Sequence, residues 1–119
     1  MGVGNRIQTS ANMKKRIYVA GPMTGLPMLN FPAFHAAEAH LLRYGYTVVN
    51  PARINPDHSM SWEDCMRKDI AELVTCGAIY LLPGWQDSKG ATLEHHIAER
   101  LGLNIILAPV VDQVSEVAA

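Results

Sequence analysis

The stretch "AIYLLPGWQDSKGATLEHHIAERLG" (residues 78–102) joins an apolar run, a glycine-rich turn and an amphipathic segment. The run at 78–82 has no polar alternation, which is typical of a strand buried on both faces. At about 100° per residue, the segment after the turn has one apolar arc. The arc contains Ala91, Leu93, Ile97, Ala98 and Leu101. A buried strand followed by an amphipathic helix predicts a βα unit of a parallel sheet.

The rest of the chain repeats this alternation. Further strands are predicted at 16–20, 46–50 and 104–108, and helices at 32–44 and from Ser61 to near Gly77. Right-handed crossovers then favour an α/β fold, a doubly wound parallel sheet of four or five strands with helices on both faces, in the order 2-1-3-4. The sequence leaves open whether the tail after residue 110 adds an edge element.

Length and composition limit the classes of protein. A chain of 119 residues is expected to form one domain, placed at 14–119, with 1–13 as a loose leader or tag remnant before Met13. The net charge of −1 argues against a nucleic acid polymer as partner. No run reaches the roughly 20 apolar residues of a membrane span. Cys65 and Cys76 are expected to be reduced thiols in a cytoplasmic protein.

Ligands of such a sheet bind beyond the carboxyl ends of its first and third strands. The loops there are "AGPMTG" and "PGWQDSKG". Each glycine is explained first by a turn, but together they fall where the fold predicts a site.

Two acids lie on helix faces that should be buried. Glu94 falls inside the apolar arc of the last helix, and Asp69 lies among the apolar residues of the helix before it. Burying a carboxylate is costly, and enzymes accept that cost at their sites. The alternative is that each acid pairs with a backbone amide or a basic side chain.

Three neighbouring residues give weaker signals. His95 and His96 lack the spacing that lets two helix histidines share a zinc ion, and both are expected at the surface. Trp85 could stack on a base or cover the core.

The segments "RIYVAGPMTG", "VVNPARI", "KDIAELVTCGAIYLLPGW" and "SKGATLEHHIAERLG" resemble the nucleoside 2-deoxyribosyltransferase superfamily, specifically a branch with a domain of unknown function. The likeness covers nearly all of residues 15–108. It implies a flavodoxin-like fold, chemistry at an N-glycosidic bond, and no cofactor or metal. Because members commonly complete the pocket with a neighbouring subunit, it also implies a homo-oligomer.

The resemblance assigns three catalytic residues. Glu94 matches the nucleophile on C1′ of the sugar, Tyr18 matches the tyrosine that steers it, and Asp69 matches the aspartate that contacts the sugar or the leaving base. A carboxylate suits an oxocarbenium-like transition state, and a second acid suits protonation of the base. The expected substrate-binding residues are Gly21, Pro22, Met23, Trp85, Ser88 and Gly90.

One position departs from the transferases. Six residues before the nucleophile they carry an aspartate for the sugar 5′-hydroxyl, and this chain has Ser88, as the similar nucleoside 5′-monophosphate N-glycosidases do. A hydrolase or transferase acting on a nucleotide or nucleoside is therefore expected. The alternatives are a non-catalytic nucleotide-binding module and a phosphoribohydrolase of the lysine-decarboxylase-like family, whose PGGxGTxxE motif loosely matches "PGWQDSKGATLE".

Overall fold

Four parallel strands form one sheet in the order β2-β1-β3-β4 in the computed structural model, which describes residues 15–56 and 59–109. The pairing of Tyr18 with Val49 on one side and with Ile79 on the other sets the register. The predicted order and the parallel direction are confirmed. The strands are β1 (Arg16–Ala20), β2 (Thr47–Val49), β3 (Ala78–Leu81) and β4 (Asn104–Leu107).

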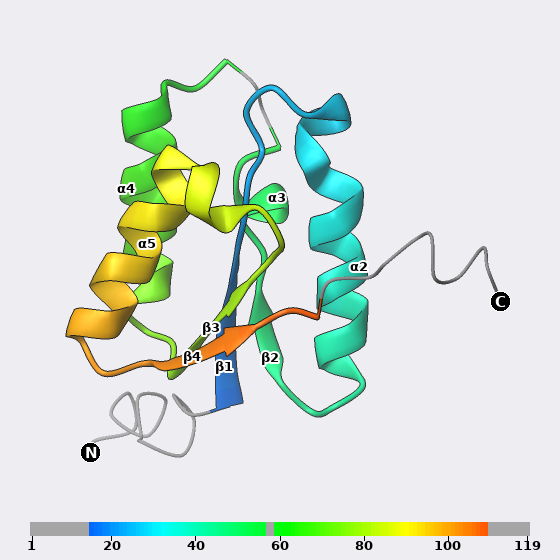
Figure 1. Ribbon diagram of the computed structural model, residues 1–119, viewed down its shortest axis with the longest axis vertical. Helices are drawn as coiled ribbons and strands as arrows, with labels where there is room; N and C mark the ends of the chain where they lie inside the picture. The colour runs from blue at the N-terminus through cyan, green and yellow to red at the C-terminus, as the bar shows by residue number, and fades with distance from the viewer. Residues whose placement is uncertain (1–14, 57–58, 110–119) are drawn as a thin grey trace, which may run out of the picture.

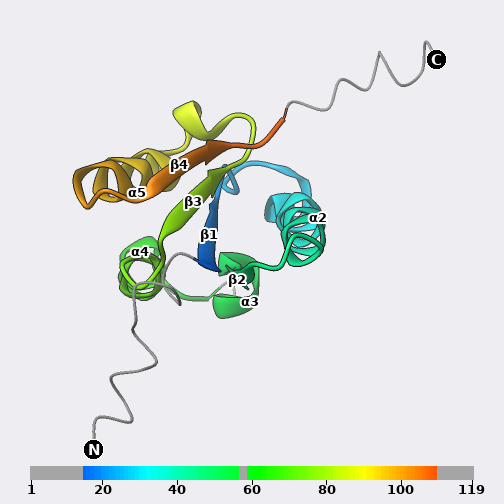
Figure 2. The same ribbon diagram turned by 90° about the horizontal axis from the view of Figure 1, so that it is seen from below.

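Helices cover both faces of the sheet, as predicted. Helix α2 packs on one face, and α4 and α5 lie on the other (Figures 1 and 2). The α-helices are α2 (Phe31–Leu42), α3 (Pro51–Ile54), α4 (Trp62–Leu73) and α5 (Lys89–Arg100), and the 3₁₀ segments are η2 (Pro27–Asn30) and η3 (Trp85–Asp87). This arrangement is a flavodoxin-like α/β fold.

The strand residues alternate between two hydrophobic clusters. Ile17 and Val19 of β1 pack toward α2 with Phe34, whereas Tyr18 of β1 packs toward α4 and α5 with Leu73. Both faces of the central strands are therefore buried, which explains their unbroken apolar sequence. The alternation also aims Tyr18 at the layer that contains Asp69 and Glu94.

Strand β4, at the edge of the sheet, is more exposed than its apolar sequence indicates. Strand β4 is as apolar as β3, yet Ile105 and Leu107 are exposed, because an edge strand has a neighbour on one side only. Leu93 and Leu101 of the predicted buried arc are exposed as well, whereas Ala91 and Ala98 are buried. Helix α5 thus buries the small residues of its arc, which allow a close approach to the sheet.

Local boundaries also differ. Helix α4 ends at Leu73 and not near Gly77, because Thr75 and Cys76 form a turn with backbone bonds to Glu72 and Leu73. Helix α3, which is not among the predicted helices, begins directly after β2, with the Asn50 side chain accepting from the amide of Ala52.

Two expectations concern residues outside the described part of the chain: the leader at 1–13 and an edge element after residue 110. The single domain at 14–119 stays a prediction. In residues 15–56 and 59–109, none of the helices has the length and hydropathy needed to cross a membrane.

Candidate active site

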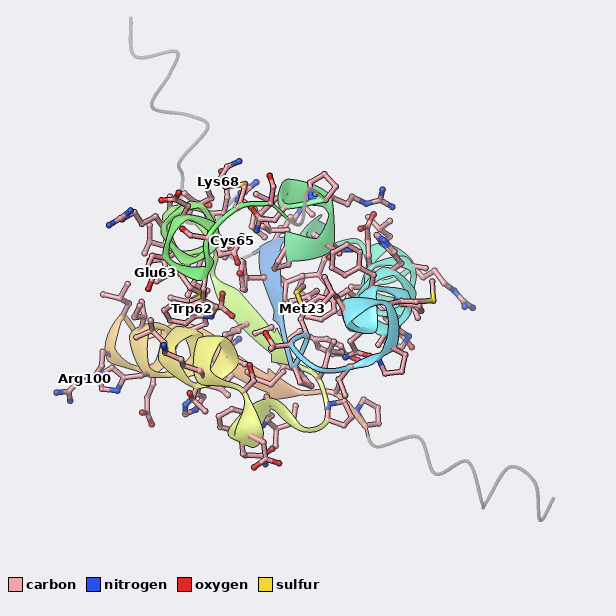
Figure 3. The ribbon with its side chains drawn as sticks, turned by 90° about the horizontal axis from the view of Figure 1, so that it is seen from above. Met23, Trp62, Glu63, Cys65, Lys68 and Arg100 are labelled. Atoms are coloured by element: carbon pink, nitrogen blue, oxygen red, sulfur yellow. The ribbon has the colours of Figure 1, made fainter. Side chains whose placement is uncertain are left out.

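A cavity of about 720 Å³ opens beyond the carboxyl ends of β1 and β3. Figure 3 looks onto this end of the sheet, with Met23 on one side of the opening and Trp62 and Cys65 of α4 on the other, while Lys68 and Arg100 point away. The volume is typical of a small-molecule site. Several expected site residues line it: Gly21, Pro22, Met23, Asp69, Ser88, Gly90 and Glu94.

The start of α5 brings Ser88 and Glu94 to the same cavity. Ser88 is the N-cap residue, and its Oγ accepts from the amide of Ala91. Six residues later the helix has made more than one and a half turns, which places Glu94 deeper on the side that faces the sheet. Glu94 is only 5% exposed, although it lines the cavity.

Tyr18 contacts Glu94 from the side of the sheet. Its hydroxyl donates a 2.6 Å hydrogen bond to Oε2 of Glu94. Tyr18 itself is fully buried, so it touches the carboxyl group and does not line the cavity. Glu94 therefore lies between the Tyr18 hydroxyl and the opening.

Burial changes the protonation of the acids. It raises the pKa of Glu94 to about 8; the Tyr18 hydrogen bond opposes this shift, and the charge of Asp69 adds to it. Burial also raises the pKa of Asp69 to about 6, opposed by Asn55, Lys68 and Tyr18. Between these values the two carboxyl groups together hold about one proton, mostly on Glu94. Burial likewise raises the pKa of Tyr18 well above its ordinary value, so its hydroxyl remains a donor.

Asp69 reaches the cavity from the other helix. It is buried on the inner face of α4, and its Oδ1 accepts a 2.6 Å hydrogen bond from Nδ2 of Asn55. The two acids identified from sequence are thus both buried and both line the cavity. Neither makes an ion pair with a basic side chain among those found in the described residues, which argues against the alternative of simple structural pairing.

Two glycines bring the walls together. A Cβ on Gly21 would lie 2.7 Å from Cβ of Leu82, so only glycine allows the end of β1 to pass so close to β3. A Cβ on Gly90 would lie 3.2 Å from Sδ of Met66, where α5 approaches α4. Close packing, and not a turn, therefore explains Gly21, whereas an alanine at position 90 would need only a small shift of the flexible Met66 side chain.

The rim near Ser88 carries charges of both signs. Lys89 and Asp87 both line the cavity, and Nζ of Lys89 lies 4.1 Å from the ring centroid of Trp62. The first amides of a helix have no intrahelical partner and attract anions. This rim is the part of the cavity best suited to an anionic group.

Trp85 lies apart from the cavity. It packs against the hydrophobic cluster beneath α5, and its ring is 4.5 Å from the ring of His95, measured between centroids. The sequence allowed Trp85 either to stack on a base or to cover the core. Trp85 covers the core, and base stacking by Trp85 has no geometric support. His96 is exposed as expected, whereas His95 is half-buried against Trp85.

Much of the cavity wall was not identified from sequence. Apolar side chains from the segment after β1, from α2, from the loop before α4 and from α4 itself supply most of it: Leu29, Phe31, Phe34, Met60, Trp62 and Met66. Among the polar residues that were missed, besides Thr24, is Asn55. Its position soon after β2 was the available signal, because the carboxyl end of β2 faces the same side as those of β1 and β3.

Within residues 15–56 and 59–109, no group of three or more His, Cys, Asp or Glu side chains is placed to hold a metal ion.

The fold is shared with a protein of solved structure. A solved structure described as 2-desoxiribosyltransferase from Leishmania mexicana superposes with a TM-score of 0.62 at 20% sequence identity. The match covers 78% of this chain and 63% of that one, so this chain spans less than two thirds of the transferase's length. The expected resemblance is confirmed at the level of the fold.

The chain belongs to the DUF4406 family, described as a domain of unknown function, whose model matches residues 15–107. The expected match to a domain of unknown function is therefore confirmed. Comparison with curated proteins gave no match.

Proposed function

We propose that the protein cleaves or transfers at the N-glycosidic bond of a nucleoside 5′-monophosphate, with Glu94 as the nucleophile on C1′. The observation that carries this proposal is the 2.6 Å hydrogen bond from Tyr18 to Glu94 at the base of a cavity that Asp69 also lines. The fold shared with a 2-deoxyribosyltransferase supports glycosyl chemistry in general.

The reaction needs two events at the sugar. An Oε atom of Glu94 forms a bond to C1′ while the C1′–N bond breaks, and the bonding electron pair leaves with the base. The base takes a proton from Asp69 as it departs. Water or an acceptor base then displaces Glu94 from C1′, which gives hydrolysis or transfer.

Because their pKa values are raised, the two acids still hold one proton at neutral pH, and this proton can be given to the departing base. At neutral pH the shared proton lies mainly on Glu94, whose pKa is about 8, and not on Asp69, whose pKa is about 6. Attack requires an ionised Glu94, and departure of the base requires a protonated Asp69. Moving one proton from Glu94 to Asp69 prepares both groups at once.

The 5′-phosphate is assigned to the rim at the start of α5. Ser88 accepts from Ala91 through Oγ and keeps its hydroxyl proton for a ligand. The amides of Lys89 and Gly90 belong to the first turn of the helix, where the dipole favours an anion. The negative charge of Asp87 on the same rim opposes phosphate binding, and the positive charge of Lys89 offsets that repulsion.

A homo-oligomer and a cytoplasmic location remain predictions.

A non-catalytic nucleotide-binding module is the second candidate. The pKa of about 8 favours it, because a protonated Glu94 is no nucleophile at neutral pH. The two functions differ in whether bound nucleotide loses its base as Glu94 ionises.

The test is incubation with a panel of nucleoside 5′-monophosphates from pH 6 to 9, with free base measured by chromatography. We expect base release from the wild type and a loss of about 100-fold or more in Glu94→Gln, which keeps the shape and removes the nucleophile. Glu99→Gln, an exposed position on the same helix, is the control and should match the wild type. Binding without base release at every pH would instead support the module.

A further inference from the structure

Asn55 makes a short contact to one of the proposed catalytic acids. It follows α3, lines the cavity and donates from Nδ2 to Oδ1 of Asp69 at 2.6 Å. Of the two carboxylate oxygens of Asp69, this bond engages one and leaves Oδ2 for other partners. The side chain therefore restricts how the Asp69 carboxylate can turn.

Capping of α3 does not explain the asparagine side chain. Asn55 is the C-cap residue, but the capping hydrogen bond runs from its backbone amide to the carbonyl of Pro51 at 2.9 Å. Any non-proline residue could donate that bond. The side chain is thus free of a capping role, and within the described residues its polar contact is the one to Asp69.

The side chain also carries a cost. Oδ1 of Asn55 is buried and finds no hydrogen-bond partner within residues 15–56 and 59–109. A buried acceptor left unsatisfied typically destabilises a protein. Proteins tolerate such a loss of stability at functional sites. The hydrogen bond to Asp69 is what the Asn55 amide contributes in return.

The bond acts on the charge of Asp69. Tyr18 from β1, Glu94 from α5 and Lys68 on α4 are the other titratable groups that influence Asp69. Burial favours the neutral acid, whereas a donated hydrogen bond favours the carboxylate. Asn55 is the strongest of the influences that lower the pKa of Asp69.

We propose that Asn55 is a positioning residue that keeps Asp69 ionised and oriented, so that the proton shared by the two acids rests on Glu94 until a substrate is bound. The inference rests on the proposed function, in which Asp69 later protonates the base. Without Asn55 both carboxyl groups would stay protonated up to a higher pH, and the pH range in which the pair holds one proton would become narrower.

The first test does not need activity. ¹³C-carboxyl NMR follows the titration of Asp69 in the wild type and in Asn55→Ala, with Asp69→Asn to assign the signal. We expect the midpoint of Asp69 to move up by about one pH unit in Asn55→Ala, which is the size of a lost hydrogen bond to a charged group. Asn104→Ala, a change at an exposed position on β4, should leave it in place. An unchanged midpoint in folded Asn55→Ala, or in Asn55→Ser if the alanine variant does not fold, overturns the proposal.

The second test uses base release. The acid limb of the kcat/KM profile should move to higher pH in Asn55→Ala, and in an Asp69→Asn background the same change should alter kcat by less than about twofold. A uniform loss of kcat with an unmoved limb, or a full additional loss in the Asp69→Asn background, would show a structural role. If no nucleotide is cleaved, the proposed function fails, while the NMR titration still decides the role of Asn55.

Discussion

The hydroxyl of Tyr18 lies 2.6 Å from Oε2 of Glu94, and the two residues are 76 positions apart in the chain. Strand β1 supplies the donor and helix α5 supplies the acid, so the contact exists only when the sheet and its covering helix are assembled. The hydrogen bond works against the burial that raises the pKa of Glu94. Tyr18 thus favours the ionised form of the proposed nucleophile without reaching the cavity itself.

Tyr18→Phe tests this relationship. The ring keeps its packing and the hydroxyl is lost, so Glu94 loses the group that favours its charged form. We expect kcat to fall about 10- to 150-fold, the equivalent of one hydrogen bond to a charged group, and the optimum to move to higher pH. The measurement is the pH profile of base release.

Tyr80→Phe is the matched control for this change. Tyr80 is buried in β3 on the opposite face of the sheet, in the cluster that packs on α2. Its hydroxyl has no part in the site, and activity should be unchanged. Equal losses in the two variants would mean that the Tyr18 hydroxyl matters only for packing.

Glu94 should also make stability depend on pH. Its pKa is raised from 4.5 to about 8, so between these values the folded protein binds more protons than the unfolded chain. The stability from this group is complete below about pH 4.5 and is lost as pH rises through about 8. The slope is at most about 1.4 kcal/mol per pH unit.

Urea unfolding at half-unit steps from pH 5 to 9 measures this effect. The free energy of unfolding should fall with pH more steeply in the wild type than in Glu94→Gln. Asp69 titrates in both proteins, so the difference between their curves isolates Glu94. Parallel curves would show that Glu94 is ionised throughout the range.

Asp69→Asn should separate substrates by their leaving group. The amide cannot donate the carboxyl proton, so release of an ordinary purine base should fall about 100-fold. A 7-methylguanine base already carries a positive charge, and its release should change little. Chromatography of the two products compares them directly, and equal losses for both bases would assign Asp69 to the sugar.

Ser88→Asp tests the phosphate rim. Aspartate is a good N-cap residue, so α5 should keep its start and the protein its stability. The added charge should repel a phosphate dianion, and affinity for a nucleoside monophosphate should fall at least about tenfold more than affinity for the nucleoside. Calorimetric titration at one ionic strength gives both values. If the wild type binds nucleoside as well as monophosphate, the rim holds no phosphate.

The sheet could be predicted from sequence because its signals are local. Unbroken apolar runs such as residues 17–20 mark buried parallel strands. Ser61 and Ser88 mark the starts of α4 and α5 through caps that involve residues three positions away. Glu94 and Asp69 were visible for a related reason. A charged residue on a buried helix face contradicts the pattern around it.

Contacts between distant segments required the assembled fold. Asn55 gains a role only because α3 lies beside α4, where Asp69 accepts its hydrogen bond. Trp85 packs against the core and not toward the cavity, which its position in a loop did not reveal. Helical periodicity assigns Leu93 and Leu101 to a buried arc, yet the position of α5 at the edge of the sheet leaves both exposed. A sequence pattern gives the orientation of a side chain on its own element, whereas burial, hydrogen bonding and pKa depend on the elements packed around it.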